Sequence, residues 1–298
     1  MKVLAACSGG PDSTAMLFVL ARLAPDFGFT LASASVNHGL RQSAAKEVEI
    51  AARQAESAGV RFYPLKIRVN KKTSVQSNAR NGRYAALKKL ASEIGAHRIA
   101  VGHTQDDQAE SVLMRILRGA GLGGLSATDP HRADGVIRPL IDCRRQKVHV
   151  YAHQRCSEIV QDPSNQDERY ERVRIRNAIL PILTMENPSI VRHLADLADD
   201  ARDQEKTIVG CAHKLLREAR NDSRTLSRTS LRTADRATRR AALRLWISSQ
   251  TGVEPGRSHI EQIDRAMMRK GEIWLPQGWI VFITKDTVFC EHQHVSFK

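Results

Sequence analysis

VLAACSGGPDSTAMLF, residues Val3–Phe18, gives the strongest indication of the fold. An apolar run enters a Ser-Gly-Gly-Pro-Asp-Ser turn, and apolar residues at helical spacing follow, which predicts a strand, a tight loop and a helix N-terminus. Gly9 and Gly10 let the backbone approach a ligand closely, and the first amides of the helix point outward with the positive end of its dipole behind them. The stretch therefore predicts an anion site suited to phosphate.

This loop is not a Walker A motif, because no Gly-x-x-x-x-Gly-Lys-Ser/Thr run occurs in the chain. A Gly-Gly turn also begins many ordinary helices, and that interpretation competes with a phosphate loop. The position of the loop favours the phosphate site, since it follows the first strand directly, where an open parallel sheet binds its ligand.

Strands and helices alternate after this loop. The patterns predict strands over 29–37, 61–68 and 99–102, and helices over 44–57, 77–94 and 105–118. They further predict a flexible loop over 119–126, a short extended segment over 136–140, a helix over 144–156, a turn over 162–165 and a charged run over 169–176. Such alternation is typical of an α/β fold with a doubly wound, Rossmann-like parallel sheet and right-handed crossovers.

The character of the chain changes beyond Pro188. A long amphipathic helical pattern runs from Ser189 towards Arg220, and helices follow over 234–249 and 258–268, with small hairpins over 272–282 and 287–290. We expect a domain boundary near residue 200, which gives domains of residues 1–200 and 201–298. The second is predicted to be smaller and mainly helical, with a short β-sheet.

The chain is strongly basic. Lys and Arg number 46 against 32 Asp and Glu, which gives a net charge of +14. A polyanionic partner, with nucleic acid as the first candidate, explains this charge, although a basic surface also promotes solubility. Five scattered cysteines without a Cys-x-x-Cys pair argue against a disulfide framework, a zinc knuckle or an iron–sulfur cluster. No apolar run reaches membrane-spanning length, so we expect a cytoplasmic protein with no membrane partner.

The loop after the fourth predicted strand carries His103, Asp106, Asp107 and Glu110. A histidine and carboxylates at a helix start can bind Mg²⁺, orient a nucleophile or accept a proton. Alternatively, the acidic residues favour the helix dipole and Glu110 completes a capping box. The functional interpretation is favoured for His103 and Asp107, and capping is at least as plausible for Asp106 and Glu110.

Two further segments supply candidate ligands for phosphate. His38 and Arg41 follow the second predicted strand, and Arg80 and Arg83 lie one turn apart on the next helix, so that they share a face. Paired guanidinium groups can stabilise charge on a phosphate under attack, although surface arginines are usually only solvated.

Taken together, these segments resemble the tRNA(Ile)-lysidine synthetase family of PP-loop ATP pyrophosphatases. The match runs through Ser8–Ser13, His38–Arg41, Ala79–Tyr84, Gly102–Glu110, Leu117–Gly119, Arg138–Leu140 and Asp162–Asn165 with the arginines that follow. The first loop is shared across the superfamily, whereas His38–Arg41 and Asp107–Glu110 are more specific. The second domain resembles the family's tRNA-recognition domain less specifically.

The resemblance implies a ligase that joins L-lysine to C2 of the wobble cytidine of an isoleucine tRNA with a CAU anticodon. ATP adenylates the cytidine, pyrophosphate leaves, and the lysine amine then displaces AMP. It implies Asp12 as the ligand of Mg²⁺, with Asp12, Arg83, His103 and Asp107 at the catalytic centre. The ATP-binding set it implies is Ser8, Gly9, Gly10, Pro11, Asp12, Ser13, His38 and Arg80. The lysine amine must lose a proton, and His103 or Asp107 is the predicted base.

Basic residues are expected to hold the tRNA backbone. The candidates are Arg138, Arg172, Arg174, Arg176, Arg236 and Arg240. About half of such arginines are instead expected to be solvated or paired within a helix.

Other functions remain as alternatives. Another PP-loop tRNA enzyme, such as a tRNA thiolase, is expected to need paired cysteines, and an amide-forming synthetase does not explain the charge. A tRNA-binding protein with an inactive nucleotide site is the alternative from a different class. The sequence leaves open a homodimer, the lysine-binding residues, the identity of the base and the share of each domain in tRNA recognition.

Overall fold

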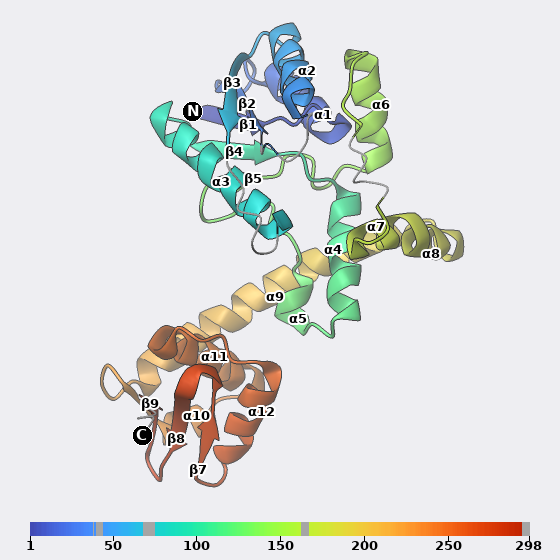
Figure 1. The fold of residues 1–298 in the computed structure, drawn as a ribbon. Helices are drawn as coiled ribbons and strands as arrows, with labels where there is room; N and C mark the ends of the chain where they lie inside the picture. Colours follow the sequence, from blue (N-terminus) through green and yellow to red (C-terminus); the bar gives the residue numbers. More distant parts are fainter. Residues whose placement is uncertain (38, 40–43, 68–74, 162–166, 294–298) are drawn as a thin grey trace. The chain divides into compact units, whose positions relative to one another are not determined.

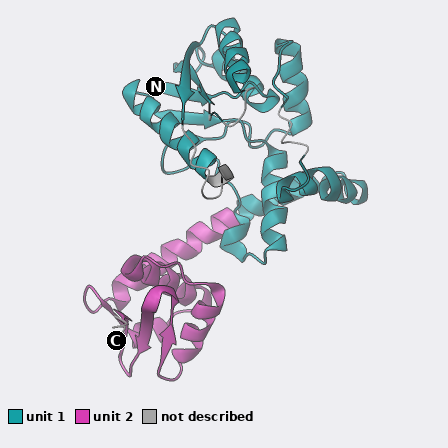
Figure 2. Cartoon of the chain, in the orientation of Figure 1, with its two compact units in different colours: residues 1–200 teal, residues 201–298 magenta. Residues whose placement is uncertain are grey.

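The computed structural model describes residues 1–37, 39, 44–67, 75–161 and 167–293. The predicted turn over 162–165 falls outside these residues. The chain divides into two compact units, Met1–Asp200 and Ala201–Lys298 (Figure 2). Within the described residues, no helix has the length and apolar character that a membrane span requires.

Unit 1 is built on a five-stranded parallel sheet with the order β3-β2-β1-β4-β5 (Figure 1). Its strands are β1 (Lys2–Ala6), β2 (Thr30–Asn37), β3 (Arg61–Lys66), β4 (Arg98–Val101) and β5 (Val136–Ile137). β2 and β4 flank β1 on opposite sides, so the order of the sheet reverses at the carboxyl end of β1, where ligands of such sheets bind. The predicted parallel, doubly wound sheet is confirmed.

Helices cover both faces of this sheet. Successive side chains of β1 point to opposite faces, so Val3 and Ala5 join one apolar cluster, and Leu4 and Ala6 join another. The first cluster packs against α1 (Pro11–Leu23), α2 (Ala44–Ser57) and α6 (Arg145–Arg155), and the second against α3 (Val75–Glu93). Because α1 and α6 lie on the same face, side chains from two distant segments meet beside the loop after β1.

The rest of unit 1 is helical. It comprises α4 (Gln105–Leu117), α5 (Leu122–Leu125), α7 (Glu171–Arg174), the π-helical turn η2 (Ile175–Ile179), α8 (Leu180–Glu186) and the start of α9 (Ile190–Ala219). The prediction of a loop throughout 119–126 is wrong, since α5 forms a helical turn there. Arg115 stabilises this turn, because its Nη1 donates to the Gly124 carbonyl at 2.8 Å.

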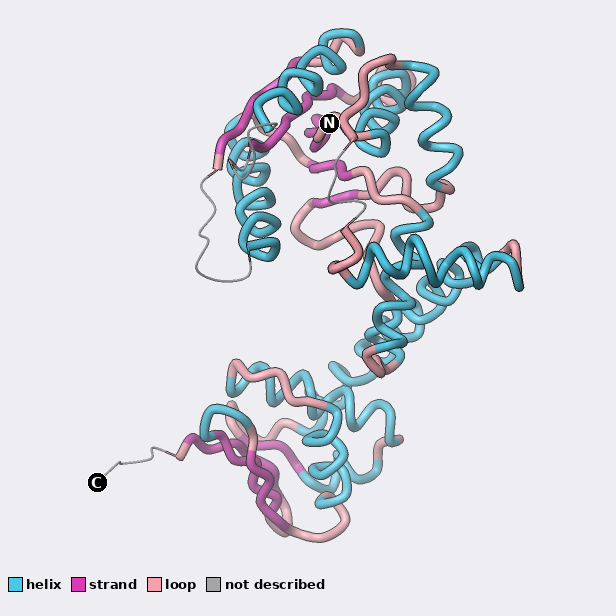
Figure 3. Tube along the Cα trace, turned by 45° about the vertical axis from the view of Figure 1, so that its right-hand side comes forward, coloured by secondary structure: helices cyan, strands magenta, loops and turns pink. Residues whose placement is uncertain are grey.

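Unit 2 packs helices against one small antiparallel sheet with the order β6-β9-β8-β7 (Figure 3). The strands are β6 (Thr225–Ser227), β7 (Gly271–Trp274), β8 (Trp279–Ile283) and β9 (Thr287–His292), and a 3₁₀ turn, η3 (Pro276–Gly278), joins β7 to β8. The helices are the end of α9, α10 (Arg228–Thr233), α11 (Arg236–Thr251) and α12 (Arg257–Ala266). Leu243, Ile247, Ile263 and Val281 are fully buried in its core. The predicted helical region with a short sheet is confirmed.

β6 and α10 were not predicted from the sequence. The segment reads as a polar loop, but Arg228 within it is only 6% exposed. Its guanidinium donates to the carbonyls of Met267 and Arg269 and to those of Thr284 and Lys285. These acceptors lie about 40 to 57 residues further along the chain, so no local sequence pattern predicts these hydrogen bonds.

Gly102 sets how closely β4 approaches the first turn of α1. A Cβ atom at this position would lie 2.9 Å from the Asp12 carbonyl oxygen and 3.1 Å from the Ser13 amide nitrogen. Both are backbone atoms, so Gly102→Ala should displace the start of α1 and lower the free energy of unfolding by about 1–3 kcal/mol.

The same displacement should raise the KM for ATP, the ligand predicted for this loop. Thermal unfolding and ATP titration of the variant measure both effects. Gly210→Ala is the matched control, because a Cβ atom there meets nothing within 4 Å. Equal behaviour of the two variants would show that the close approach at Gly102 has no consequence.

Candidate active site

The loop after β1 wraps around the N-terminus of α1. Gly9 has φ 78°, and a Cβ atom there would lie 2.7 Å from Val160 Cγ2, so both conformation and space require glycine. The Ser8 amide donates to Ser13 Oγ at 3.1 Å, and Ser13 Oγ donates to the Gly10 carbonyl at 3.0 Å. Pro11 begins the helix with its φ already helical. The loop is therefore held in shape by its own serines and presents a helix N-terminus at the switch point of the sheet.

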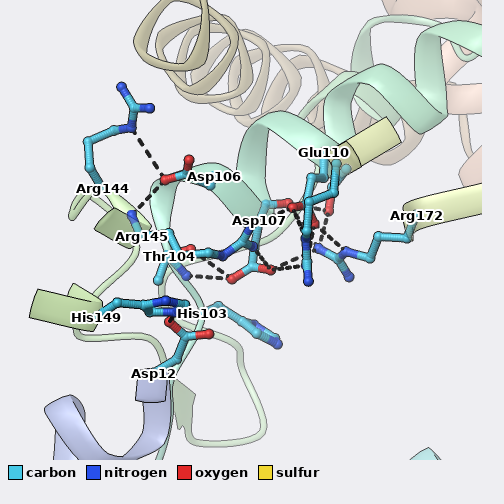
Figure 4. Close-up of polar contacts among 12 residues, drawn as sticks. Asp12, His103, Thr104, Asp106, Asp107, Glu110, Arg144, Arg145, His149 and Arg172 are labelled. Carbon is cyan, nitrogen blue, oxygen red and sulfur yellow. Dashed lines mark hydrogen bonds and ion pairs between the residues drawn. The ribbon is translucent and has the colours of Figure 1, made fainter. Parts of the chain in front are cut away.

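Asp12 lies in the first turn of α1 with 30% of its side chain exposed. Its Oδ1 lies 3.2 Å from Nε2 of His149, a residue of α6 (Figure 4). His149 was not predicted as a site residue, because nothing in the sequence around this histidine indicates a contact with Asp12, 137 residues away. Asp12 thus presents a partly open carboxylate beside the phosphate loop.

The α4 carboxylates have different roles from those expected. The backbone N–H and the hydroxyl of Thr104 donate to Asp107 Oδ2 at 2.8 and 2.9 Å, so the capping box belongs to Asp107. The capping box proposed for Glu110 is wrong, since its fully buried side chain points to arginines instead. Asp106 lies in the first turn of α4, as expected, and its carboxylate also accepts from the backbone N–H of Arg145 at 2.7 Å, which caps the start of α6.

Arginines surround the fully buried Glu110 and the half-buried Asp107 of α4, and Figure 4 shows Arg145 and Arg172 among them. Arg145 donates to Asp107 at 2.8 Å and to Glu110 at 2.7 Å, and thereby joins α6 to α4. Arg172 and Arg176 each place Nε 2.7 Å from a Glu110 oxygen. Three guanidinium groups against two carboxylates leave an excess positive charge, which suits an anionic ligand.

The surrounding charges decide the ionisation of these groups. Burial raises the pKa of Asp107, but Arg145, Arg172 and the Thr104 amide together lower this pKa to about 2. Burial opposes ionisation of Glu110 as well, and Arg176 and Arg145 hold the pKa of Glu110 below its ordinary value. Both carboxylates are therefore anionic at neutral pH and are poor proton acceptors.

His103 follows β4 directly. Burial lowers the pKa of His103 to about 4, Arg138, Arg172 and Arg80 act in the same direction, and Asp107 opposes them. The imidazole is therefore neutral at pH 7. A group with this pKa is a weak base for a lysine ammonium with a pKa of about 10.4.

The predicted nucleotide ligands on α3 are placed differently. Arg83 lines a small pocket at the carboxyl ends of β1 and β2, together with Ser8, Ser35 and Glu47. Arg80 is exposed and its guanidinium lies over the ring of Tyr84, 5.4 Å from the centroid. His38 lies outside the described residues.

The arginines predicted to bind tRNA lie in four different environments. Arg138 is only 5% exposed, and Arg172 and Arg176 belong to the cluster around Glu110. In unit 2, Arg240 Nε donates to Asp264 at 2.8 Å, and Arg236 is exposed with its Nε 3.6 Å from the same carboxylate. Arg174 is exposed and donates to the carbonyls of Glu168 and Arg169.

Segments of both units match known protein families. Residues 1–183 match the model of a PP-loop domain, and residues 226–293 match that of a TilS substrate binding domain. A curated tRNA(Ile)-lysidine synthase of Leifsonia xyli subsp. xyli is 33% identical over 263 residues, which are 86% of this chain and 79% of the relative. The tRNA(Ile)-lysidine synthase of Symbiobacterium thermophilum is 38% identical to this chain over 73% of this chain and 46% of the relative. The tRNA(Ile)-lysidine synthase of Thermobifida fusca is 38% identical over 67% of this chain and 62% of the relative. The chain spans about half the length of several such relatives.

A solved structure shares the fold. The U34-tRNA thiolase NcsA from Methanococcus maripaludis, solved with its [4Fe-4S] cluster, aligns with a TM-score of 0.57 at 22% identity. The alignment covers 67% of this chain and 72% of that chain.

Proposed function

The chain belongs to the tRNA(Ile)-lysidine synthase family, and from this membership we propose that it joins L-lysine to the wobble cytidine of an isoleucine tRNA with a CAU anticodon. The observation that carries the proposal is the convergence of a phosphate loop, an open carboxylate at Asp12 and an arginine-rich cluster around Asp107 and Glu110. This arrangement suits the transfer of an adenylyl group between two anionic partners.

The first proposed step consumes ATP. The C2 carbonyl oxygen of the cytidine attacks the α-phosphorus, the bond to the β-phosphate oxygen breaks, and pyrophosphate leaves. The α1 N-terminus and the hydroxyls of Ser8 and Ser13 bind the pyrophosphate moiety, and Arg83 faces the nucleotide from α3. Arg145 of α6, Arg172 of α7 and Arg176 of η2, which surround Glu110, stabilise charge on the phosphate under attack.

The second proposed step forms the carbon–nitrogen bond. The lysine amine attacks C2, the C2–O bond breaks, AMP leaves with that oxygen, and the amine loses a proton. Esterification makes the oxygen a good leaving group, which explains why ATP is needed. The depressed pKa values of Asp107 and His103 favour binding and orienting roles for them over the predicted role of base.

Asp12 fits a Mg²⁺ ion bound together with ATP. Mg²⁺ usually takes one or two carboxylates plus substrate phosphates and water, and Asp12 offers a partly exposed carboxylate beside the phosphate loop. No group of three or more His, Cys, Asp or Glu side chains that could hold a metal occurs among the described residues, in keeping with a metal bound mainly by substrate. Bound Mg²⁺ would neutralise phosphate charge and orient the leaving pyrophosphate.

We propose that tRNA contacts come mainly from exposed arginines such as Arg174 and Arg236. The paired arginines around Glu110 are assigned to the catalytic centre instead. With a net charge of +14, the protein should bind tRNA with strong salt dependence. Because the proposed substrate is a tRNA, we also propose that the reaction takes place in the cytoplasm.

A tRNA thiolase is the second candidate function, because NcsA shares the fold. The cysteines do not favour it. Cys7 adjoins the phosphate loop, but its thiol is buried, and burial raises the pKa of Cys7 to about 11. A protonated, buried thiol is a poor nucleophile for sulfur transfer.

The products formed from ATP test the proposed function. With isoleucine tRNA, lysine and Mg²⁺ present, purified protein should release AMP and pyrophosphate, resolved by thin-layer chromatography of α- and γ-labelled ATP. AMP release should require the tRNA, since the cytidine oxygen is the nucleophile. Release of ADP, or equal AMP release without tRNA, would contradict the proposal.

A further inference from the structure

Arg138 is held in a buried position from which it contacts His103. It follows β5, its residue is 5% exposed, and its backbone N–H donates to the Pro130 carbonyl at 3.0 Å. Its Nε donates to His103 Nδ1 at 2.7 Å, and its Nη1 donates to the Asp129 carbonyl. The Arg138 side chain is therefore fixed in contact with His103, a candidate catalytic residue, and it is not available to contact a tRNA backbone.

This contact determines the tautomer of His103. A guanidinium group has five N–H donors and no acceptor, so an imidazole nitrogen that pairs with it must offer a lone pair. A neutral imidazole carries one proton, which then lies on Nε2. We propose that Arg138 is a positioning residue that locks His103 as the neutral tautomer protonated on Nε2, so that His103 acts as a hydrogen-bond donor to the α-phosphate.

The groups around His103 keep the ring neutral. Arg80, Arg138 and Arg172 all disfavour a further positive charge there, and Asp107 favours it. Asp107 is itself engaged by Arg145 and by the backbone N–H and hydroxyl of Thr104. No partner is recorded for Nε2 among the described residues, so this N–H remains available to a ligand.

A neutral donor suits both steps of the proposed function, on which this inference rests. Negative charge grows on oxygens bound to the α-phosphorus when the cytidine attacks, and again when AMP leaves. A fixed N–H aimed at such an oxygen stabilises each transition state without moving a proton. In this role His103 donates a hydrogen bond, whereas the sequence predicted that it accepts a proton as a base.

Nitrogen NMR of the full chain tests the tautomer directly. In protein labelled with ¹⁵N-histidine, the His103 ring should show an unprotonated Nδ1 and a protonated Nε2 from pH 5.5 to 8, with the signals assigned by their loss in His103→Gln. Arg138→Met should give a mixture of tautomers, and Arg138→Lys should restore part of the Nε2-protonated form. A protonated Nδ1 in the unaltered protein, or the same tautomer in Arg138→Met, would overturn the inference. The unaltered protein gives its answer without any activity, so failure here is distinct from failure of the proposed function.

Two substitutions of His103 separate donor from base. The amide N–H of glutamine can occupy the position of Nε2, whereas asparagine reaches only the position of Nδ1. If His103 donates, His103→Asn should lower kcat by about 10²–10³-fold relative to the unaltered protein. The kcat of His103→Gln should be at least about 10-fold higher than that of His103→Asn, with little change in the KM for ATP in either variant. Equal and complete loss in both variants, with both folded by circular dichroism, would contradict a donor role.

Discussion

Replacing Asp12 by asparagine should lower kcat for AMP formation by about 10³-fold while leaving the Kd for tRNA within about twofold. The carboxylate lies beside the phosphate loop with 30% of its side chain exposed, and it offers an oxygen ligand for a hard cation there. Asparagine keeps the shape and can still accept from His149, so the change removes the charge alone. AMP release under saturating ATP and tRNA filter binding measure the two quantities.

Asp26→Asn is the matched control for this prediction. It makes the same change at an exposed residue just beyond the end of α1, away from the phosphate loop, and should leave both quantities unaltered. Added Mg²⁺ should restore part of the activity of Asp12→Asn if the loss is one of metal affinity. Loss of tRNA binding in Asp12→Asn would give the loop a different function, and undiminished AMP formation would remove Asp12 from the metal site.

Replacing Glu110 by glutamine should lower the free energy of unfolding of unit 1 by about 3 kcal/mol or more. The side chain is 0% exposed and accepts from Arg145, Arg172 and Arg176, so the change leaves three guanidinium groups with one carboxylate among them. Buried charges without partners cost far more than surface pairs. Glu158→Gln is the control, because Glu158 pairs with Arg53 where both side chains are 53% exposed, and it should cost at most about 1 kcal/mol.

The tryptophans allow this effect to be located. Trp246, Trp274 and Trp279 all lie in unit 2, so tryptophan fluorescence reports unit 2 alone. In Glu110→Gln, the urea unfolding transition followed by circular dichroism should shift to lower urea concentration than in the unaltered protein. The unfolding transition followed by tryptophan fluorescence should stay in place. A shift of both, or of neither, would contradict a local role for Glu110 in unit 1.

The pH dependence follows from the same ion pairs. The pKa of Glu110 is lower in the folded protein than in the unfolded chain, so its contribution is present above the unfolded pKa of about 4.3. The contribution is lost as the pH falls through the lower folded pKa. The difference in stability between the protein and Glu110→Gln should therefore be constant from pH 5 to 8 and shrink below pH 4.

The fold was largely predictable because its signals are local. Strands and helices alternate with clear periodicity up to residue 118, and glycine or proline marks many of their ends. The position of the phosphate loop directly after β1 then predicted a ligand site at the carboxyl end of this strand. β6 and α10 were missed because Arg228 finds its acceptors between Met267 and Lys285, which no local pattern reveals.

The site was predictable in its loops but not in its pairings. Asp12 and Asp107 follow strands and could be named, whereas Arg145 and His149 come from α6, whose sequence is that of an ordinary charged helix. The sequence also could not assign Glu110, since capping and ion pairing use the same residue type. Which role a carboxylate takes depends on the guanidinium groups that the fold places beside it.

Transfer of labelled lysine to tRNA tests the proposed ligase activity. Protein, ATP, Mg²⁺, ¹⁴C-lysine and an isoleucine tRNA with a CAU anticodon are incubated together, and acid-precipitated label is compared with AMP released. We expect covalent label on the tRNA in equal amount to AMP, and none on the same tRNA with uridine in place of the wobble cytidine. Absence of label on the cytidine tRNA, or equal label on both tRNAs, would contradict it.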